Sequence, residues 1–335
     1  RTTPESFELQ QLFREMADAG CTHVVMEVSS HSLVLNRVAG IRFAVGAFTN
    51  LTQDHLDFHH TMQAYAEAKA KLFGVCGVGC INVDDAWSGV MTKDAQCDIL
   101  RYSADSKDAE LTAKNIKFMP SAVEFCAQFK GESADVRLAI PGKFSVYNAL
   151  NTIAIGLALG ISLADCAEAM SSAHGVKGRM EVVPTDGDYT VIIDYAHTPD
   201  ALENALKALK AVTNERVVVL FGCGGDRDRT KRPIMGGIAA DNANFVIVTS
   251  DNPRTEEPQA IVDEILCGLE GKSTPHIAIC DRVEAIKWAI DNHRPNDVIL
   301  LAGKGHEDYQ VVGHEKHHMD EREIVAEHIE MRNKK

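Results

Sequence analysis

Short apolar runs rich in β-branched residues recur along the second half of the chain, and glycine or aspartate comes within two residues after each run. These runs cover residues 191–193, 217–221, 245–249 and 298–301. Such runs, bounded by turn formers, are typical of strands buried on both faces of a parallel sheet. Helix-length segments separate them. This half is therefore predicted to be a Rossmann-like, doubly wound α/β domain.

The first half shows a more mixed pattern. The apolar stretches 24–28 and 43–49 predict two strands, and residues 98–138 alternate in short runs that predict antiparallel hairpins at one side of a sheet. A long alanine-rich helix is expected to open at 141–148 and to run through residue 159. Strands and helices together predict that the first half is also an α/β domain.

The segment 174–179 separates the two patterns. It is short and basic, contains two glycines, and precedes a new alternation of strands and helices. We therefore place the domain boundary here, with domains at 1–176 and 177–335.

Three polar loops follow the predicted strands of the second domain. They are Gly222-Cys223-Gly224-Gly225-Asp226-Arg227, Asp251-Asn252-Pro253-Arg254 and Gly303-Lys304-Gly305-His306-Glu307. In an open α/β sheet the loops at the carboxyl ends of the strands line the ligand crevice. Arginine, aspartate and glutamate in one crevice predict a site for a small zwitterion that carries carboxylates and amines.

The first domain has candidate metal ligands where its strands are predicted to end. Glu27 lies near the end of the stretch 24–28, where a carboxylate of the Walker-B type contacts Mg²⁺; the alternative is a glutamate on the solvated face of an edge strand. His55, His59 and His60 follow the stretch 43–49 in a loop rich in aspartate, and imidazole can also complete a metal shell.

Composition narrows the class of protein. The chain has 335 residues and a formal net charge of −14, which argues against general nucleic-acid binding. No apolar run is long enough to insert into a membrane, and the N-terminal residues do not match a signal peptide. Nine scattered cysteines without a zinc-type spacing predict reduced thiols and a cytoplasmic protein.

Seven short strings, taken together and in order, resemble the Mur ligases, ATP-dependent enzymes that form amide bonds in peptidoglycan synthesis. The match is closest to the members that add diaminopimelate as the third residue of the peptide. The strings are Glu27-Val28-Ser29-Ser30-His31, Thr49-Asn50-Leu51 with Asp54-His55-Leu56-Asp57, Ala68-Lys69, Gly178-Arg179-Met180-Glu181, Asp194-Tyr195-Ala196-His197-Thr198-Pro199, Gly224-Gly225-Asp226-Arg227-Asp228 and Gly303-Lys304-Gly305-His306-Glu307.

The resemblance implies an incomplete central ATPase domain of the P-loop type followed by an amino-acid-binding domain. No Gly-x-x-x-x-Gly-Lys-Ser/Thr loop is present, and the chain starts at Arg1. The expectation is a fragment that lacks the first domain and the Walker-A loop, and that is inactive by itself. A monomer is expected, with small-molecule substrates as its partners.

The resemblance also implies the reaction of an acid–amino-acid ligase. ATP converts the side-chain carboxylate of D-glutamate in UDP-N-acetylmuramoyl-L-alanyl-D-glutamate to an acyl phosphate, which an amine of meso-2,6-diaminopimelate then attacks. Glu27 and His55 are implied ligands of the Mg²⁺ that accompanies ATP. Lys69 matches a lysine that is carbamylated in these ligases, and in that form it becomes a third metal ligand.

Binding residues follow from the same resemblance, motif by motif. Diaminopimelate needs a guanidinium for the carboxylate that lysine lacks, and Arg254 within the loop 251–254 is the implied group. Two positions depart from the family pattern, Leu35 and Ser145, and we omit them. The implied residues are Asn148, Arg179 and Asp194 for ATP; Thr2, Thr3, Ser29 and Arg37 for the UDP-muramoyl dipeptide; and Arg227, Asp251, Asn252, Pro253, Arg254, Gly303 and Glu307 for diaminopimelate.

Two other functions remain open from the sequence. A ligase like folylpolyglutamate synthetase shares the ATPase plan but is not expected to carry the 251–254 motif. A non-catalytic binding module would fit a true loss of the phosphate loop. We discount His314, His317 and His318 as a metal site and Cys223 as a nucleophile, because the former are predicted to lie in a charged turn and the latter has no neighbouring base in the sequence.

Overall fold

The computed structural model describes residues 2–52, 55–105, 108–173 and 175–334. The chain divides into two compact units. The first contains residues 1–116, 124–137 and 146–171, and the second contains 117–123, 138–145 and 172–335. The exact boundary between 176 and 177 remains a prediction.

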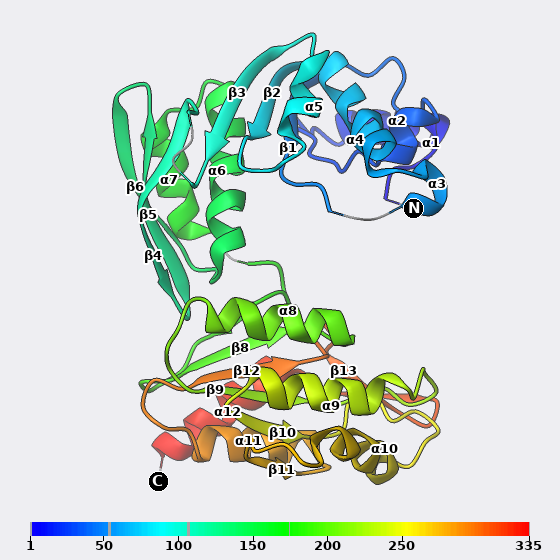
Figure 1. The fold of residues 1–335 in the computed structure, drawn as a ribbon, viewed down its shortest axis with the longest axis vertical. Helices are drawn as coiled ribbons and strands as arrows, with labels where there is room; N and C mark the ends of the chain where they lie inside the picture. The colour runs from blue at the N-terminus through cyan, green and yellow to red at the C-terminus, as the bar shows by residue number, and fades with distance from the viewer. Residues whose placement is uncertain (1, 53–54, 106–107, 174, 335) are drawn as a thin grey trace. The chain divides into compact units, whose positions relative to one another are not determined.

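A six-stranded sheet organises the first half of the chain, in the order β1-β2-β3-β4-β5-β6 (Figure 1). The pairs β1–β2, β2–β3 and β3–β4 are parallel, and two-residue turns join β4, β5 and β6. The predicted hairpins are therefore present only from residue 111 onward, because β3 is a parallel strand. The strands are β1 (Phe43–Phe48), β2 (Cys76–Asn82), β3 (Asp98–Ser103), β4 (Leu111–Met119), β5 (Ala122–Phe129) and β6 (Glu132–Leu138).

Side-chain caps set the starts of several helices in this half. Thr61 caps α4 by accepting a hydrogen bond from the backbone N–H of Ala64, and Ser29 caps α2 in the same way through Ser32. The long helix expected after residue 141 is α6. The helices are α1 (Ser6–Asp18), α2 (Ser30–Val34), α3 (Leu56–His59), α4 (Met62–Ala70), the 3₁₀ turn η1 (Lys71–Gly74), α5 (Ser88–Lys93), α6 (Lys143–Ala158) and α7 (Leu163–Ser172).

The strand predicted at residues 24–28 is wrong. This stretch has no strand structure, and Val25 is 98% exposed. β1 is an edge strand whose described partner is β2, and 24–28 does not pair with its free edge, so the stretch lacks the ladder of hydrogen bonds that a strand needs. Thr3 holds the stretch instead, since its hydroxyl donates to the carbonyl oxygen of Glu27 at 3.0 Å and accepts from the N–H of Ser29 at 3.1 Å.

The doubly wound domain predicted for the second half is confirmed. Its sheet has the order β11-β10-β9-β12-β8-β7, and all neighbours are parallel except β7, which is antiparallel to β8. Every residue of β9 and β12 is buried, as the apolar runs predicted. The strands are β7 (Glu181–Val183), β8 (Thr190–Asp194), β9 (Val217–Phe221), β10 (Phe245–Val248), β11 (His276–Ala278) and β12 (Val298–Ala302).

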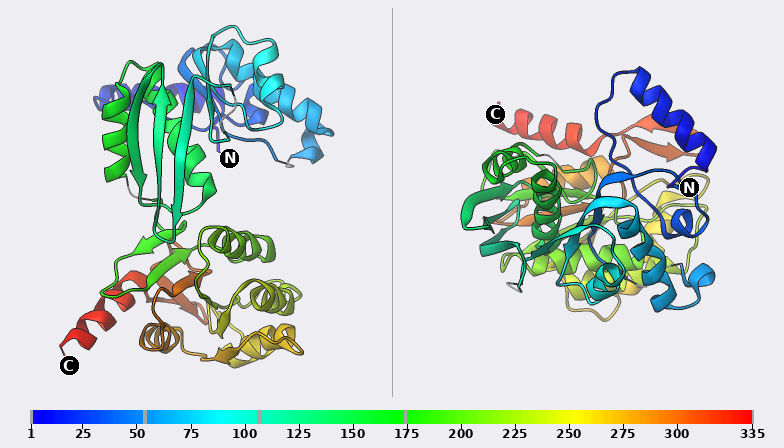
Figure 2. Two further views of the ribbon diagram at one scale, coloured as in Figure 1. Left: turned by 60° about the vertical axis from the view of Figure 1, so that its left-hand side comes forward. Right: turned by 90° about the horizontal axis from the view of Figure 1, so that it is seen from above.

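Helices cover both faces of this sheet (Figures 1 and 2). Alternate residues of the strands point to opposite faces: Leu300 packs in a core with α8, α9 and α10, whereas Leu301 packs with α11 and α12. The helices are α8 (Pro199–Lys210), α9 (Lys231–Asn242), α10 (Pro258–Leu266), the 3₁₀ turn η2 (Cys267–Leu269), α11 (Arg282–Asp291) and α12 (Glu321–Asn333), and a separate hairpin comprises β13 (Tyr309–Val312) and β14 (Glu315–His318).

The strand order places a ligand crevice at one edge of the second sheet. After β8 the chain passes to β9, continues outward to β10 and β11, and then returns to insert β12 between β8 and β9. These five strands are parallel, so the loops after them leave from the same edge. The three polar loops identified in the sequence are those that follow β9, β10 and β12.

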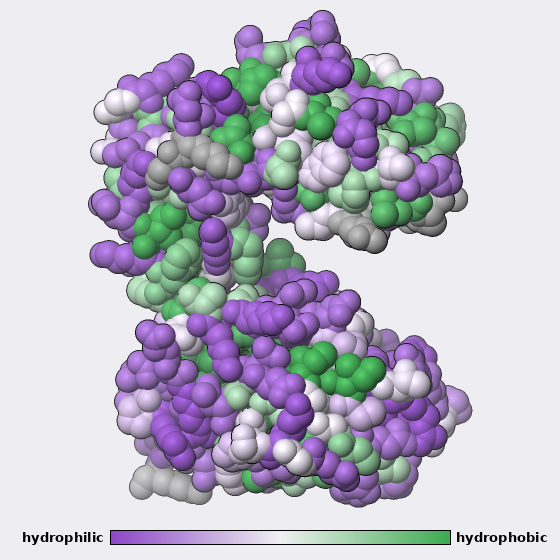
Figure 3. All heavy atoms as spheres, in the orientation of Figure 1, coloured by the Kyte–Doolittle hydropathy of each residue, from purple (hydrophilic) through white to green (hydrophobic). Residues whose placement is uncertain are grey.

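No described helix is long and apolar enough to cross a membrane. On the face seen in Figure 3, hydrophilic residues predominate and apolar residues form scattered patches.

Packing between α9 and the α10–η2 segment leads to a stability prediction. A Cβ atom on Gly236 would lie 2.3 Å from the carbonyl oxygen of Ile265, whereas one on Gly237 would meet its nearest neighbour, the carbonyl oxygen of Gly268, at an ordinary 3.5 Å. We expect Gly236→Ala to lower the free energy of unfolding by about 1–3 kcal/mol through overpacking. Gly237→Ala, the matched control in the same helix, should be neutral or stabilising by up to about 1 kcal/mol. Chemical denaturation measures both; equal effects would contradict the close helix contact.

Candidate active site

One asparagine ties the three polar loops of the second unit together. The backbone oxygen of Asn252 accepts a hydrogen bond from the N–H of Gly225 at 2.9 Å. Its side-chain Nδ2 donates to Glu307 Oε2 at 2.9 Å, and its Oδ1 accepts from Lys304 Nζ at 3.0 Å. The loops after β9, β10 and β12 are therefore held against one another, as their positions in the sequence predicted.

Glycines allow these loops to approach so closely. A Cβ atom on Gly225 would lie 1.9 Å from the carbonyl oxygen of Pro253, and one on Gly222 would lie 2.4 Å from that of Thr249. Each contact is with rigid backbone, so no other residue fits at either position.

The two arginines predicted to bind a carboxylate flank the same glycine. A Cβ atom on Gly224 would lie 2.8 Å from Nη1 of Arg254 and 3.8 Å from Cγ of Arg227. Nη1 of Arg254 also donates to the carbonyl oxygen of Gly225 at 2.8 Å. The Arg254 side chain therefore lies against the loop that carries Arg227.

Arg254 has a left-handed backbone, with φ of 52°. This conformation is unfavourable for a side chain of its size. Two hydrogen bonds to the β13–β14 hairpin hold it: the N–H of Arg254 donates to the carbonyl oxygen of Val311 at 3.0 Å, and its carbonyl oxygen accepts from the N–H of Gly313 at 2.7 Å. Backbone strain held in this way is common at functional sites.

A buried ammonium balances the acidic groups of the crevice. Lys304 is fully buried, with its Nζ 3.0 Å from Glu307 Oε2 and 3.6 Å from Asp251 Oδ1. Gly303 adjoins this cluster, because a Cβ atom there would lie 3.2 Å from Asp251 Oδ2. An isolated buried ammonium would be very costly, so the two carboxylates are what keep Lys304 stable in this position.

Arg232 stabilises the loop after β9 through its ion pair with Glu256. It is fully buried and binds Glu256 through two hydrogen bonds of 2.8 and 2.9 Å. Glu256 in turn accepts from the N–H of Asp226 at 2.7 Å. The hydrogen bond from Arg232, more than any other contact, lowers the pKa of Glu256 to about 2, so this carboxylate is ionised at neutral pH.

The predicted nucleotide residues of the second unit lie together beside the loop 303–307. The Cζ atom of Arg179 is 5.1 Å from the centroid of the Tyr195 ring, and Asp194 Oδ2 accepts a hydrogen bond from the N–H of Met180 at 2.8 Å. Burial raises the pKa of Asp194, although the Met180 N–H and the charge of Arg179 oppose that shift. The third predicted nucleotide residue, Asn148, is exposed on α6 in the first unit.

Three of the residues predicted for the UDP-linked substrate form one cluster in the first unit. Thr3 is buried and contacts Ser29 as described above, and Arg37 donates from Nη1 to the carbonyl oxygen of Thr3 at 3.3 Å. Arg37 is nearly buried and also forms an ion pair with Glu5 at 2.9 Å. Thr2 is exposed next to this cluster.

Imidazoles and aromatic rings gather around Tyr65 on α4. The ring of His55 lies 5.9 Å from that of Tyr65, Lys69 Nζ lies 5.3 Å from its centroid, and His59 stacks on it at 5.1 Å. His55 and Lys69 thus contact the same tyrosine, and Glu27 is exposed.

The described residues do not fit a formed metal site. No three histidine, cysteine, aspartate or glutamate side chains among them are grouped so that they could hold an ion. Asp54, part of the same predicted loop, lies outside the described residues. The ligand set of Glu27, His55 and Lys69 remains a prediction, and no reaction step is derived through a metal.

Comparison with known proteins identifies the family. Residues 1–156 match the model of the Mur ligase middle domain, and residues 178–305 match that of the Mur ligase, glutamate ligase domain. The chain belongs to the Mur ligase family.

Individual Mur ligases match over nearly the whole chain. A UDP-N-acetylmuramoyl-L-alanyl-D-glutamate–2,6-diaminopimelate ligase of Caldanaerobacter subterraneus is 48% identical over 97% of this chain and 67% of its own length. One from Synechococcus elongatus is 47% identical over 96% of this chain and 65% of its own length. A solved structure with the same enzyme name is 37% identical, with a TM-score of 0.80, and covers 99% of this chain and 69% of that one.

Several residues that shape this Mur ligase site were not predicted from the sequence. Lys304 was named only as part of a motif, and Arg232 was not considered. The role of Arg232 depends on carboxylates 24 and 32 positions away, which no local pattern shows.

The structure describes the residues that we discounted as a nucleophile and as a metal site. Cys223 is buried, and burial raises the pKa of its thiol to about 12, so it is not ionised at neutral pH. His314 lies in the turn of the exposed β13–β14 hairpin, whereas His317 and His318 lie on strand β14 and not in the predicted turn. There the imidazole of His318 contacts Glu323, which raises its pKa.

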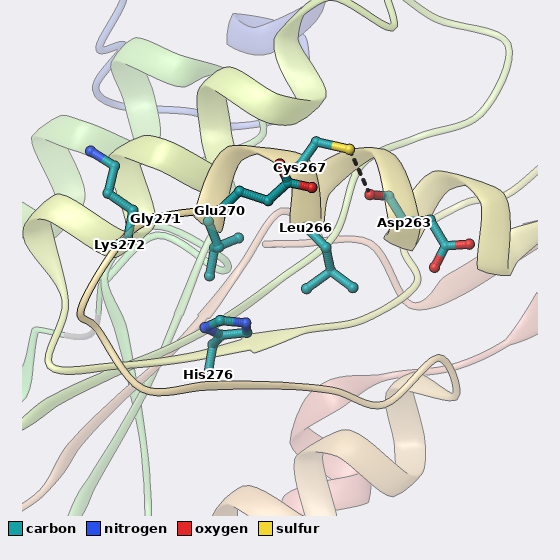
Figure 4. A pocket seen from close by; sticks show the side chains of 8 residues that line it. Asp263, Leu266, Cys267, Glu270, Gly271, Lys272 and His276 are labelled. Atoms are coloured by element: carbon teal, nitrogen blue, oxygen red, sulfur yellow. Dashed lines mark hydrogen bonds between the residues drawn. The ribbon is translucent and has the colours of Figure 1, made fainter.

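A hollow of about 490 Å³ lies elsewhere in this Mur ligase, between the α10–η2 segment and β11 (Figure 4). Cys267 points along the helix there and donates to the carbonyl oxygen of Asp263 at 3.4 Å. None of the predicted site residues lines this hollow, so we assign it no part in ligation.

The buried ammonium leads to a testable prediction. Lys304→Met keeps the length of the side chain but leaves Glu307 and Asp251 without their cation, and we expect it to lower the free energy of unfolding by about 3 kcal/mol. Lys316→Met is the control, because Lys304 and Lys316 both lie over the Tyr309 ring, with Nζ 5.5 and 3.9 Å from its centroid, but Lys316 is exposed. Its effect should stay within about 0.5 kcal/mol. Chemical denaturation at neutral pH checks both, and similar values would show that Lys304 does not depend on these carboxylates.

Proposed function

We propose that this protein uses ATP to join meso-2,6-diaminopimelate to UDP-N-acetylmuramoyl-L-alanyl-D-glutamate, the activity named for its relatives. The observation that carries the proposal is the arrangement around Asn252. The side chain of Asn252 binds Glu307, its carbonyl oxygen binds the loop that carries Arg227, and Arg254 lies against that loop.

The charges of this crevice match diaminopimelate. Its far carbon carries both a carboxylate and an ammonium, whereas lysine has only the ammonium. A guanidinium binds a carboxylate through a planar pair of N–H groups, and Glu307 has the opposite charge needed for the ammonium. Asp251, Asn252, Pro253 and Gly303 shape the pocket through the contacts described above. A ligand without the carboxylate would leave Arg254 desolvated and unpaired.

The ligation reaction has two steps, formation of an acyl phosphate and formation of the amide. The side-chain carboxylate of D-glutamate attacks the γ-phosphate of ATP, which gives an acyl phosphate and ADP. An amine of diaminopimelate then attacks the acyl carbon, phosphate leaves, and the new amide loses a proton. Anions meet in the first step, so positive charge near the phosphates lowers its barrier.

We assign ATP to Asn148, Arg179 and Asp194. Arg179 brings a cation, and the carboxylate of Asp194 is a suitable acceptor for a ribose hydroxyl. Mg²⁺ would accompany ATP and neutralise its phosphates. Glu27, His55 and a carbamylated Lys69 remain its candidate ligands.

We assign the UDP-linked dipeptide to Thr2, Thr3, Ser29 and Arg37. The hydroxyl of Thr3 already has a donor and an acceptor within the protein, so we infer that Thr3 acts by positioning Ser29. We further propose a cytoplasmic monomer with domains at 1–176 and 177–335. ATP and nucleotide-linked sugars are cytoplasmic substrates, and the nine cysteines are free.

Substitution of Arg254 tests the amino-acid assignment. In the full-length protein, Arg254→Ala should raise the KM for diaminopimelate by about 100-fold, because it removes a charged partner of the substrate carboxylate. The KM for the UDP-linked dipeptide should not change. Arg14→Ala, at an exposed arginine of α1, is the control and should leave all constants as they are. An unchanged KM for diaminopimelate would refute the role of Arg254.

Phosphate release separates this proposal from the folylpolyglutamate synthetase alternative. The unsubstituted protein is given ATP with diaminopimelate and the muramoyl dipeptide, or with glutamate and a folate. We expect release only with the first pair. Release only with glutamate and folate would replace the proposed substrates while leaving ATP-dependent ligation intact.

A further inference from the structure

Arg322, in α12, connects two segments that carry proposed binding residues. Its Nε donates to Glu181 Oε1 at 2.8 Å, and its Nη2 binds the other oxygen of that carboxylate. The same Nη2 donates to the carbonyl oxygen of Gly305 at 2.9 Å, and Nη1 donates to Asp320 Oδ1 at 2.9 Å. This set of bonds requires the planar, forked guanidinium and is beyond the reach of a lysine ammonium.

Glu181 extends the connection to the segment with Arg179. Its Oε2 accepts a hydrogen bond from the N–H of Gly178 at 2.6 Å. Burial alone would raise the pKa of Glu181, but the hydrogen bonds from Arg322 and Gly178 outweigh this effect and lower it. The carboxylate is therefore ionised, and it holds the turn immediately before Arg179.

The two connected segments touch through their backbones. A Cβ atom on Gly178 would lie 2.1 Å from the carbonyl carbon of Gly305 and 2.1 Å from the N of His306. A Cβ atom on Gly305 would lie 2.6 Å from Cβ of Tyr195. Both glycines have positive φ. With no space between these segments, a displacement of one displaces the other.

α12 does not need Arg322 to stay attached to the sheet. Val325 is fully buried in the core that includes α11, Asp291 Oδ1 accepts a hydrogen bond from His328 Nε2 at 2.8 Å, and Arg332 donates to the carbonyl oxygen of Ile290 at 3.1 Å. The contacts of Arg322 are directed instead at the segments 178–181 and 303–307.

We propose that Arg322 is a positioning residue that couples the nucleotide segment around Arg179 to the amino-acid segment around Glu307. This inference rests on the proposed function, since those two segments are assigned to ATP and to diaminopimelate there. Through Glu181 and Gly305, one guanidinium fixes the positions of both segments. ATP and the amino acid are thereby held at the distance and orientation that attack on the acyl phosphate needs.

Two variants test this coupling in the full-length protein. Arg322→Lys keeps the charge but loses the fork, and Glu181→Gln keeps the shape but loses the ion pair. Each should raise both the KM for ATP and the KM for diaminopimelate by about tenfold, while the KM for the UDP-linked dipeptide stays within about twofold. The double variant should be little worse than either single one, because both remove the same connection.

Arg332→Lys, a second arginine of α12, is the matched control and should change no KM. Thermal unfolding identifies any variant that fails to fold. If Arg322→Lys does not fold, the KM values of Glu181→Gln alone test the coupling. A rise in only one of the two KM values would overturn the coupling, as would a fall in kcat with all KM values unchanged, which indicates a structural role alone. If the unsubstituted protein prefers another amino acid, the proposed function fails, and the same joint rise measured with that amino acid still tests the coupling.

Discussion

The hydrogen bonds of Asn252 are the interaction on which the second unit's crevice depends. Parallel strands bring their loops to one edge of the sheet, but they do not fix how the loops contact one another. The amide of Asn252 does so because it has both a donor and an acceptor: Nδ2 binds Glu307, while Oδ1 accepts from Lys304 and from the N–H of Val311. Aspartate would lose the donor and add a negative charge beside Glu307.

Buried charges support this crevice in place of apolar packing. Arg282 and Glu321 form a fully buried ion pair at 2.8 Å, and the guanidinium also binds the carbonyl oxygens of Ser250 and Ala302, near the ends of β10 and β12. Such pairs add little net stability, because desolvation offsets most of their attraction. They fix geometry instead, since a guanidinium donates its hydrogen bonds only in its own plane. The loops are thereby held at the ends of their strands.

The sequence predicted the arrangement of the candidate site residues better in the second unit than in the first. In the second unit, the sequence predicted that the loops bearing Arg227, Arg254 and Glu307 lie close together. This follows because the carboxyl ends of parallel strands lie at the same edge of the sheet. In the first unit the assignment of 24–28 to a strand was wrong, since an apolar run forms a strand only where a neighbour completes its hydrogen bonds. The grouping of Glu27 with His55 and Lys69 came from the resemblance and stays a prediction.

Local sequence determined the buried strands and the doubly wound class of the second domain, and its short motifs indicated the family, because apolar runs and motifs are properties of neighbouring residues. Tertiary structure alone decided which charges are buried and what they contact. Lys304, Arg232 and Arg322 look like ordinary surface cations in the sequence. Their partners lie at the ends of other strands and helices, and only the folded chain brings those groups within hydrogen-bonding distance.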